Sequence, residues 1–202
     1  MENKIINLEE ARNILKFVKR IYPALNGVRV ELGDSFAYYP ADLRITIPKI
    51  FKDEEVGYDI LTHVNREFGA DFDLNLRNIS VQALLHEIGH HLDFEGKIFT
   101  CVIEEYLMAE QYNRNIYNQA NEEFSTKVNN YLVELEYYES LDEVDEDTVF
   151  RLESKRIELE QEDKELDMLY RFIPTEYAAD EFSARFFMTY LRGYKKCNYN
   201  VL

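Results

Sequence analysis

This chain has few of the residues that cross-link or sharply turn a polypeptide. Of its 202 residues only two are cysteines, Cys101 and Cys197, and they lie far apart and in no metal-binding spacing. A disulfide scaffold is therefore not indicated, and a reducing compartment fits the composition. Seven Gly and four Pro predict few tight turns, so we expect a fold that is mostly helical.

Long apolar runs are also missing. No segment approaches the roughly 18 consecutive apolar residues that a membrane-spanning helix needs. Residues 1–23 show no basic start followed by an apolar run, the pattern of a signal peptide. We therefore expect a cytoplasmic protein.

Positive charge is scarce relative to negative charge. The chain has 23 Lys and Arg against 39 Asp and Glu, a formal net charge of −16. Such a surface repels phosphate backbones and anionic headgroups, so we expect neither nucleic acid nor a membrane as a partner. A basic partner or substrate remains compatible with the charge, although solubility alone also accounts for it. Hydrophobic residues make up 46% of the chain, enough for a sizeable core.

Hydrophobic periodicity predicts an α+β, helix-rich fold. Apolar positions recur at helical spacing in residues 8–21. At 28–32 and 43–47 they alternate with polar residues, which predicts two or three short antiparallel strands. A further helix is expected near 56–68, and Ser80 is a candidate N-cap for the helix after it.

The second half of the chain has a different composition. From about 100 to 172 it is rich in Glu, Lys, Leu and Tyr and has no Gly or Pro. It predicts two long helices, broken near the acidic turn 142–147, that pair as an antiparallel hairpin. Pro174 then opens a last helix that runs to about Leu191. The expected organisation is one catalytic domain in three parts: an N-terminal part at 1–98, an inserted helical hairpin at 99–172 and a ligand helix at 173–202.

The most informative segment is LLHEIGHHLDFEG, residues 84–96, which holds three of the four histidines. His86, Glu87 and His90 form the pattern HExxH. At about 100° per residue the two histidines share the helix face opposite an apolar stripe, where they can bind one Zn²⁺. Zinc lowers the pKa of a bound water towards about 7, and Glu87 is placed to take its proton as general base.

A zinc hydrolase site needs a third protein ligand. His63 lies upstream and is expected in the core or at the surface. Glu176 and Asp180 are four residues apart and share a face of the last predicted helix, where the small Ala178 and Ala179 permit close approach to the HExxH helix. We expect Glu176 to bind the zinc and Asp180 to hold a histidine ring in its metal-binding tautomer. The alternative is an ordinary acidic helix start.

Two segments resemble the gluzincin-type metallopeptidases: HEIGHHLDF and EYAADEFSARFFM. The pattern looks most like the ImmA/IrrE peptidases and is also similar to the peptidase domain of anthrax lethal factor. The resemblance implies a minimal zincin core, made of an N-terminal helix, a small antiparallel sheet, the HExxH helix and the ligand helix. It implies one Zn²⁺ per chain, with His86, His90 and Glu176 as ligands and Glu87 as general base.

The chain departs from this family pattern in two ways. Between His90 and Glu176 lie 85 residues, more than these families usually have, so an inserted hairpin would reshape the substrate cleft. Asp180 stands where the ImmA/IrrE pattern tends to have Asn, which barely affects the metal chemistry. The resemblance covers roughly residues 1–95 and 170–192.

Three further residues carry weaker expectations. Asp93 lies near the ligand face, either as a hydrogen-bond partner of a ligand or simply exposed to solvent. His91 projects away from the ligand pair and is expected to be structural or at the surface. Tyr170, by analogy with lethal-factor-like peptidases, is a candidate donor to the oxyanion of the reaction. The strand near 43–47 is expected to bind substrate as an added edge strand.

The sequence thus predicts a zinc metalloendopeptidase that hydrolyses peptide bonds in a protein or peptide substrate. The resemblance implies one role, regulated cleavage of a transcriptional repressor in a phage or mobile element. Two alternatives stay open: a non-catalytic scaffold in which zinc joins two helices and the hairpin at 100–172 recruits a protein partner, and a lethal-factor-like peptidase toxin or effector. Glu87 favours a peptidase, because a structural zinc site has no use for a general base.

Overall fold

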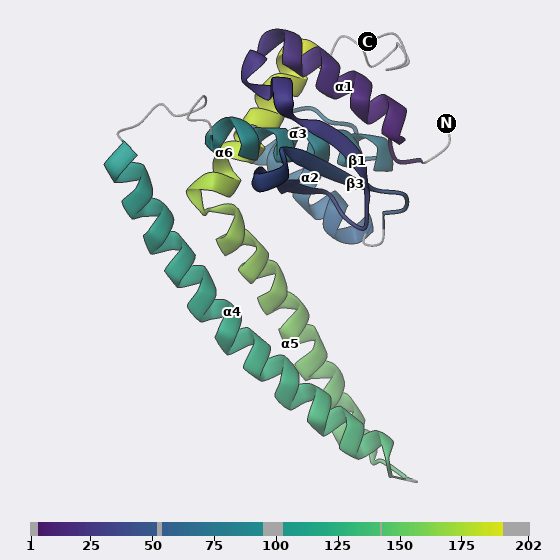
Figure 1. Cartoon of the computed structure of the whole chain (residues 1–202). Coiled ribbons are helices and arrows are strands. Elements are labelled where there is room, and N and C mark those ends of the chain that lie inside the picture. Colours follow the sequence, from purple (N-terminus) through teal and green to yellow (C-terminus); the bar gives the residue numbers. More distant parts are fainter. Residues whose placement is uncertain (1–3, 52–53, 95–102, 142, 192–202) are drawn as a thin grey trace. The chain divides into compact units, whose positions relative to one another are not determined.

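A computed structural model describes residues 4–51, 54–94, 103–141 and 143–191 (Figure 1). Cys101 and Cys197 lie outside these residues. The chain divides into two compact units, here called the core unit and the hairpin unit. The core unit comprises Met1–Thr100 and Tyr177–Leu202, and the hairpin unit comprises Cys101–Glu176. The fold is helix-rich with one small sheet, which confirms the α+β class.

The first helix of the core unit, α1 (Leu8–Ile21), has the bounds predicted from periodicity. Its start is fixed by a capping box: the Asn7 side chain accepts a hydrogen bond from the Glu10 backbone N–H, and the Glu10 carboxylate accepts one from the Asn7 backbone N–H. The Glu10 carboxylate also forms a 2.7 Å ion pair with Arg77. After Ile21, Pro23 opens a short 3-10 turn, η1 (Pro23–Gly27).

The sheet has three strands, β1 (Arg29–Gly33), β2 (Ala37–Tyr39) and β3 (Arg44–Pro48), in the order β1-β3-β2. A short 3-10 turn, η2 (Pro40–Asp42), joins β2 to β3. The pair β2–β3 is antiparallel as expected, but β1–β3 is parallel, so the prediction of an antiparallel sheet is wrong. The reason is topological: the chain reverses twice between β1 and β3, and β3 inserts between its two predecessors.

The position of β3 also overturns the predicted substrate strand. β3 is central and paired on both sides, so the segment near 43–47 has no free edge to offer. Its residues Ile45 to Pro48 are all buried, as expected of a strand covered on both faces.

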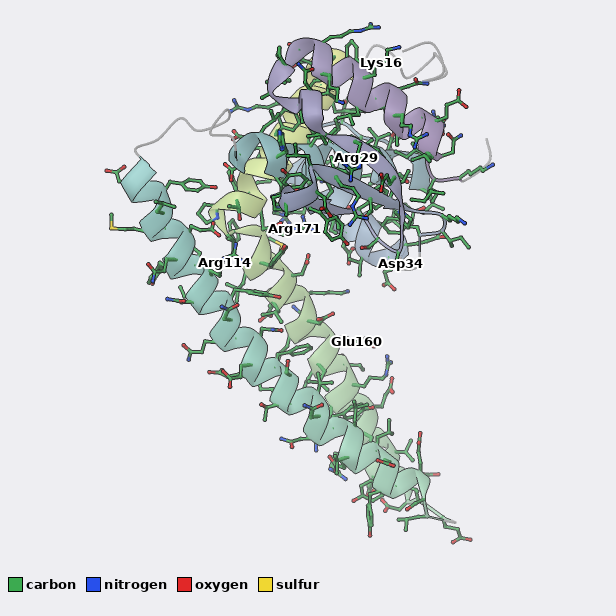
Figure 2. The ribbon with its side chains drawn as sticks, in the orientation of Figure 1. Lys16, Arg29, Asp34, Arg114, Glu160 and Arg171 are labelled. Carbon is green, nitrogen blue, oxygen red and sulfur yellow. The ribbon has the colours of Figure 1, made fainter. Side chains whose placement is uncertain are left out.

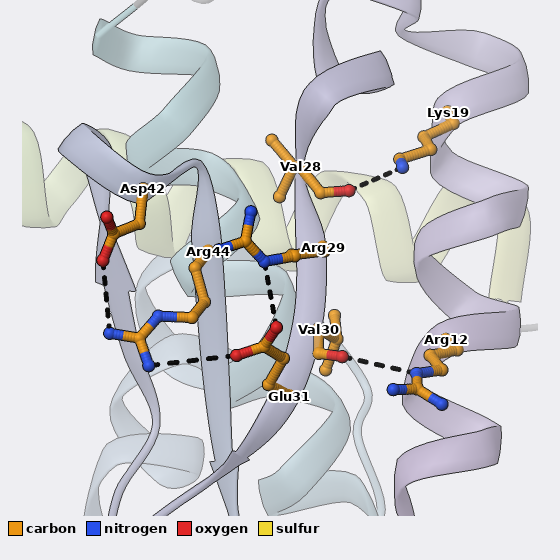
Figure 3. A network of polar contacts seen from close by, with 8 residues as sticks. All are labelled: Arg12, Lys19, Val28, Arg29, Val30, Glu31, Asp42 and Arg44. Atoms are coloured by element: carbon orange, nitrogen blue, oxygen red, sulfur yellow. Dashed lines mark hydrogen bonds and ion pairs between the residues drawn. The ribbon is translucent and has the colours of Figure 1, made fainter.

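Two side chains of α1 bond carbonyl groups at the outer edge of β1, one within the strand and one just before it (Figure 3). The Lys19 ammonium donates to the Val28 carbonyl at 2.6 Å, and the Arg12 guanidinium donates to the Val30 carbonyl at 3.3 Å. Cations that bond the free carbonyls of an edge strand prevent it from pairing with another chain. The other edge strand of this sheet is β2.

Two helices follow the sheet, α2 (Glu54–Phe68) and α3 (Leu76–Phe94). The predicted N-cap of α3 is wrong. Asn75 accepts the backbone N–H of Asn78 at 2.9 Å, whereas Ser80 lies one turn inside the helix and donates its hydroxyl to the Leu76 carbonyl at 2.6 Å. The apolar stripe of α3 is fully buried in the core, at Val81, Leu84, Leu85, Ile88 and Leu92.

The last helix, α6 (Pro174–Phe186), continues into a π-helical turn at Phe187–Leu191, as the predicted range implies. The boundary between the two units falls inside it, after Glu176. Phe187 stacks on Phe72 with ring centroids 3.8 Å apart, which fixes the C-terminal part of this helical segment in the core unit.

The hairpin unit contains α4 (Ile103–Glu139) and α5 (Glu146–Arg171), which run antiparallel side by side (Figure 1). This confirms the predicted hairpin. Asp145 caps α5 by accepting the Thr148 N–H at 2.9 Å. Charged side chains project from both helices along their length (Figure 2), and interhelical ion pairs join Lys127 to Glu162 and Glu134 to Arg151.

Among the described residues, no helix has a window apolar and long enough to cross a bilayer.

Candidate metal centre

Helix α3 presents His86 and His90 one turn apart on the same face. Their ring centroids are 4.5 Å apart and the rings are nearly perpendicular, at 88°. His86 is 7% exposed and His90 is partly exposed, so the pair lies at the edge of the core rather than in solvent. The opposite face of α3 carries the buried apolar stripe, and this burial holds the two rings in place.

Glu176, in the first turn of α6, completes a group of three possible ligands. One donor atom from each of His86, His90 and Glu176 lies within 4.8 Å of the others. Donors about 2.1 Å from one tetrahedral ion are about 3.4 Å apart, so atoms within 4.8 Å of one another are close enough to share an ion. The Glu176 side chain is buried, at 6% exposure. These residues can hold a metal ion.

Two small residues set the approach of α6 to α3. A Cβ placed on Gly89 would meet the Cα of Ala179 at 2.8 Å, closer than real Cβ atoms come. Gly89 lies between the two histidines in the sequence, and Ala179 lies one turn after Glu176. The absence of a side chain at Gly89 is what allows α6 to lie close to the histidine-bearing turn.

Asp180 bonds to a ring of the candidate site. Its Oδ1 atom lies 2.7 Å from Nδ1 of His86, and Asp180 is 1% exposed. A carboxylate accepts, so Nδ1 carries the proton and Nε2 keeps a lone pair for a metal. The expected partner of a histidine ring is thus in contact with His86.

Sequence reasoning missed two members of this network. Gln82 donates from Nε2 to Asp180 Oδ1 at 3.1 Å, and Ser183 donates its hydroxyl to the Asp180 carbonyl at 2.7 Å. Both are buried. Gln82 lies four residues before His86, and Ser183 lies three residues after Asp180. A search for polar residues one turn from each expected site residue would have found them.

The remaining residues of the motif lie in different environments. Glu87 is half-buried and has no hydrogen-bond or ion-pair partner within the described ranges, so its carboxylate is available. Asp93 is 5% exposed, so of its two alternatives solvent exposure is wrong, and a role as hydrogen-bond partner of a ligand stays a prediction. His91 is structural: Nε2 donates to the Ala24 carbonyl at 3.2 Å, and Nδ1 accepts from the Tyr38 hydroxyl at 2.6 Å.

Two other candidates lie on α2 and α5. His63 is a buried residue of α2, as expected. Tyr170 lies near the end of α5, where its ring packs at a centroid distance of 5.3 Å against Tyr117 of α4. Its role as an oxyanion donor stays a prediction.

A scan against family models and searches of curated proteins and of solved structures find no match to this chain.

Proposed function

We propose that this chain is a zinc-dependent metalloendopeptidase that hydrolyses peptide bonds of a protein substrate. The observation that carries the proposal is the convergence of His86, His90 and Glu176 to within 4.8 Å, with Glu87 on the same turn as the histidines. Two imidazoles and one carboxylate are a donor set typical of catalytic zinc, which keeps a further position open for water or substrate.

Bound zinc would polarise the substrate carbonyl and make a water acidic enough to react near neutral pH. The chain's own residues would do the rest. Asp180 accepts from Nδ1 of His86, so that Nε2 would be the atom that binds the ion, and Gln82 holds Asp180. Glu87, adjacent to the first ligand and available, takes a proton from the attacking water and passes it to the leaving amine.

The substrate backbone pairs with β2 in this proposal. β2 is an edge strand that contacts the HExxH helix: the Tyr38 hydroxyl of β2 donates a hydrogen bond to Nδ1 of His91 in α3. An extended peptide added to this edge would gain main-chain hydrogen bonds alongside the helix that holds the ligands.

The hairpin unit favours a basic protein as substrate or partner. Residues 101–176 contain 7 Lys and Arg against 21 Asp and Glu, a formal net charge of −14. Residues 1–100 and 177–202 together contain 16 against 18, a net charge of −2. The hairpin therefore carries most of the chain's excess charge, which would speed association with a basic surface and repel a second acidic copy.

The fold supports an ImmA/IrrE-like zincin as the wider class. An N-terminal helix, a small sheet, the HExxH helix and a carboxylate-bearing helix occur in this order, with α2 between the sheet and α3 and the hairpin helices between α3 and α6. Regulated cleavage of a DNA-binding repressor fits the preference for a basic partner, because such proteins carry basic surfaces.

The test is Glu87→Gln in the full chain. We expect zinc content equal to that of the unchanged protein and turnover lower by about 10²–10⁴-fold, the usual contribution of a general base. The measurements are metal analysis and mass spectrometry of new termini in a peptide library. Glu55→Gln, an exposed substitution in the first turn of α2, is the matched control. Equal turnover in the Glu87→Gln protein would defeat the peptidase mechanism.

The second candidate is a zinc-stabilised scaffold without catalysis. It is favoured by large apolar side chains that the hairpin exposes: Met108, Tyr112, Val133, Tyr137 and Phe150 are each at least 60% exposed. Such side chains on an acidic two-helix arm suit a protein partner. Stoichiometric zinc without hydrolysis of any peptide, and with no effect of Glu87→Gln, would select this candidate.

A further inference from the structure

Within the hairpin unit, the Glu110 carboxylate of α4 contacts the start of α6. Glu110 of α4 accepts the backbone N–H of Thr175 through Oε2 at 3.1 Å, and its Oε1 lies 3.4 Å from the Thr175 hydroxyl. Thr175 is the residue before Glu176. The Glu110 side chain is only 16% exposed, so this contact is largely withdrawn from solvent.

The contact satisfies a specific need of α6. The first N–H groups of a helix have no partner inside the helix, and a negative charge beside them is favourable. In α6 the first residue is Pro174, which has no N–H, so Thr175 is the first residue with a donor to satisfy. Glu110 supplies the acceptor from a position 65 residues earlier in the chain. It therefore acts as a tertiary N-cap.

Arg114, one turn after Glu110 on α4, completes the arrangement (Figure 2). Its Nε donates to Glu110 Oε1 at 3.0 Å, and its Nη2 lies 3.4 Å from the Thr175 hydroxyl. Hydrogen bonding to Glu110 raises the pKa of Arg114, with further contributions from the charges of Glu176 and Tyr170. The positive charge of the guanidinium thus interacts favourably with the carboxylates of both Glu110 and Glu176.

We propose that Glu110 and Arg114 are positioning residues for Glu176, the possible metal ligand in the first turn of α6. Glu110 fixes the first turn of α6 in helical form, and Arg114 offsets the charge between the Glu110 and Glu176 carboxylates. The inference rests on the proposed ligand role of Glu176. It does not require that the protein be a peptidase.

Glu134 provides a matched control on the same helix. It is also a carboxylate of α4 paired with basic groups, Arg151 and Lys155 of α5, and its side chain is 23% exposed. Its partners lie within the hairpin and away from α6. Removing Glu134 tests loss of hairpin ion pairs alone, and removing Glu110 tests loss of the cap on the ligand helix.

The experiment measures Co²⁺ affinity and the visible absorption spectrum of Co²⁺ bound to the full-length chain, with competition against a chromophoric chelator. We expect Glu110→Ala to lower the affinity about 10–100-fold, the usual effect of losing a residue that supports a ligand. Its spectrum should shift towards that of Glu176→Ala, because Arg114 is released to pair with Glu176. Glu110→Gln, which keeps an acceptor oxygen, should recover part of the loss. Glu134→Ala should leave affinity and spectrum unchanged.

The outcomes separate this inference from the proposed function. If the unchanged protein binds no Co²⁺, the metal site itself is wrong. If it binds Co²⁺ and Glu110→Ala binds it equally tightly with the same spectrum, the site stands and the positioning role is wrong. Equal losses in Glu110→Ala and Glu134→Ala would also overturn the positioning role, because the effect would then come from general loosening of the hairpin.

Discussion

Each of the two units is stabilised internally by a different kind of interaction. In the core unit the helices and strands share one apolar cluster, in which Ile14, Ile45 and Leu84 are each 0% exposed. In the hairpin unit the most buried apolar residues of α5, Leu152 and Leu166, are still 8% exposed, and Phe150 is 76% exposed. Interhelical ion pairs such as Lys127–Glu162 supplement this thin apolar seam.

The difference in packing between the two units bears on how firmly each can hold a metal-binding side chain. Ligands need side chains held in one geometry, and dense packing supplies this better than solvated helices do. His86 and His90 sit on a helix whose other face is the centre of the core. Glu176 sits on a helix that starts in the hairpin unit and continues in the core unit. Of the three possible metal ligands, two therefore belong to the core unit and one belongs to the hairpin unit.

The largest expected effect is on stability, where truncating a buried side chain of the core unit is compared with truncating an exposed side chain of the hairpin unit. Leu84→Ala removes a fully buried side chain from α3 and should lower the free energy of unfolding by about 2–5 kcal/mol. Ile157→Ala on α5, where the side chain is 55% exposed, should change it by less than about 0.5 kcal/mol. Urea denaturation of both variants is the measurement. Similar losses of unfolding free energy in both variants would show that apolar burial stabilises the hairpin unit as strongly as the core unit.

A smaller effect is expected on zinc affinity, where a carboxylate of the core unit is compared with a carboxylate of the hairpin unit. Asp180→Asn removes the charge behind His86 and should weaken zinc binding about 10–100-fold, because the ring loses the partner that fixes its tautomer. Asp163→Asn, an exposed carboxylate of α5, should leave zinc affinity unchanged. Chelator competition measures both, with the melting temperature of the metal-free proteins as a check on folding. Unchanged affinity in Asp180→Asn would remove the assigned role of Asp180.

The smallest effect tests the ion pairs of the hairpin. Lys127→Gln breaks the pair with Glu162, and we expect a reduction in melting temperature far below that of Leu84→Ala. The difference from the unchanged protein should shrink in 1 M NaCl, where charges are screened within about 3 Å. A loss as large as that of Leu84→Ala, and insensitive to salt, would contradict the view that the hairpin depends little on any one pair.

Sequence reasoning succeeded where the signal is local. The bounds of α1 follow from the periodicity that ends before Pro23, and the hairpin follows from a long stretch without Gly or Pro. The pairing of His86 with His90 follows from helical spacing. Glu176 was found because Asp180 lies one turn after it on the same helix face.

It failed where the signal is not local. The alternation at 28–32 and 43–47 shows that strands exist but not which strands are neighbours, so the parallel β1–β3 pair was missed. Ser80 resembles an N-cap, but Asn75 stands earlier in the chain and offers the same acceptor. Glu110 gives no sign in the sequence that it caps a helix 65 residues away.

The separation of Glu176 from the two histidines has a consequence for synthesis. The ribosome makes His90 86 residues before Glu176, an interval of roughly 4–17 s at ordinary rates of elongation. During that interval the nascent chain can offer an ion the histidines but not the last donor. The group of three possible metal ligands can therefore form only after the chain has been extended through Glu176.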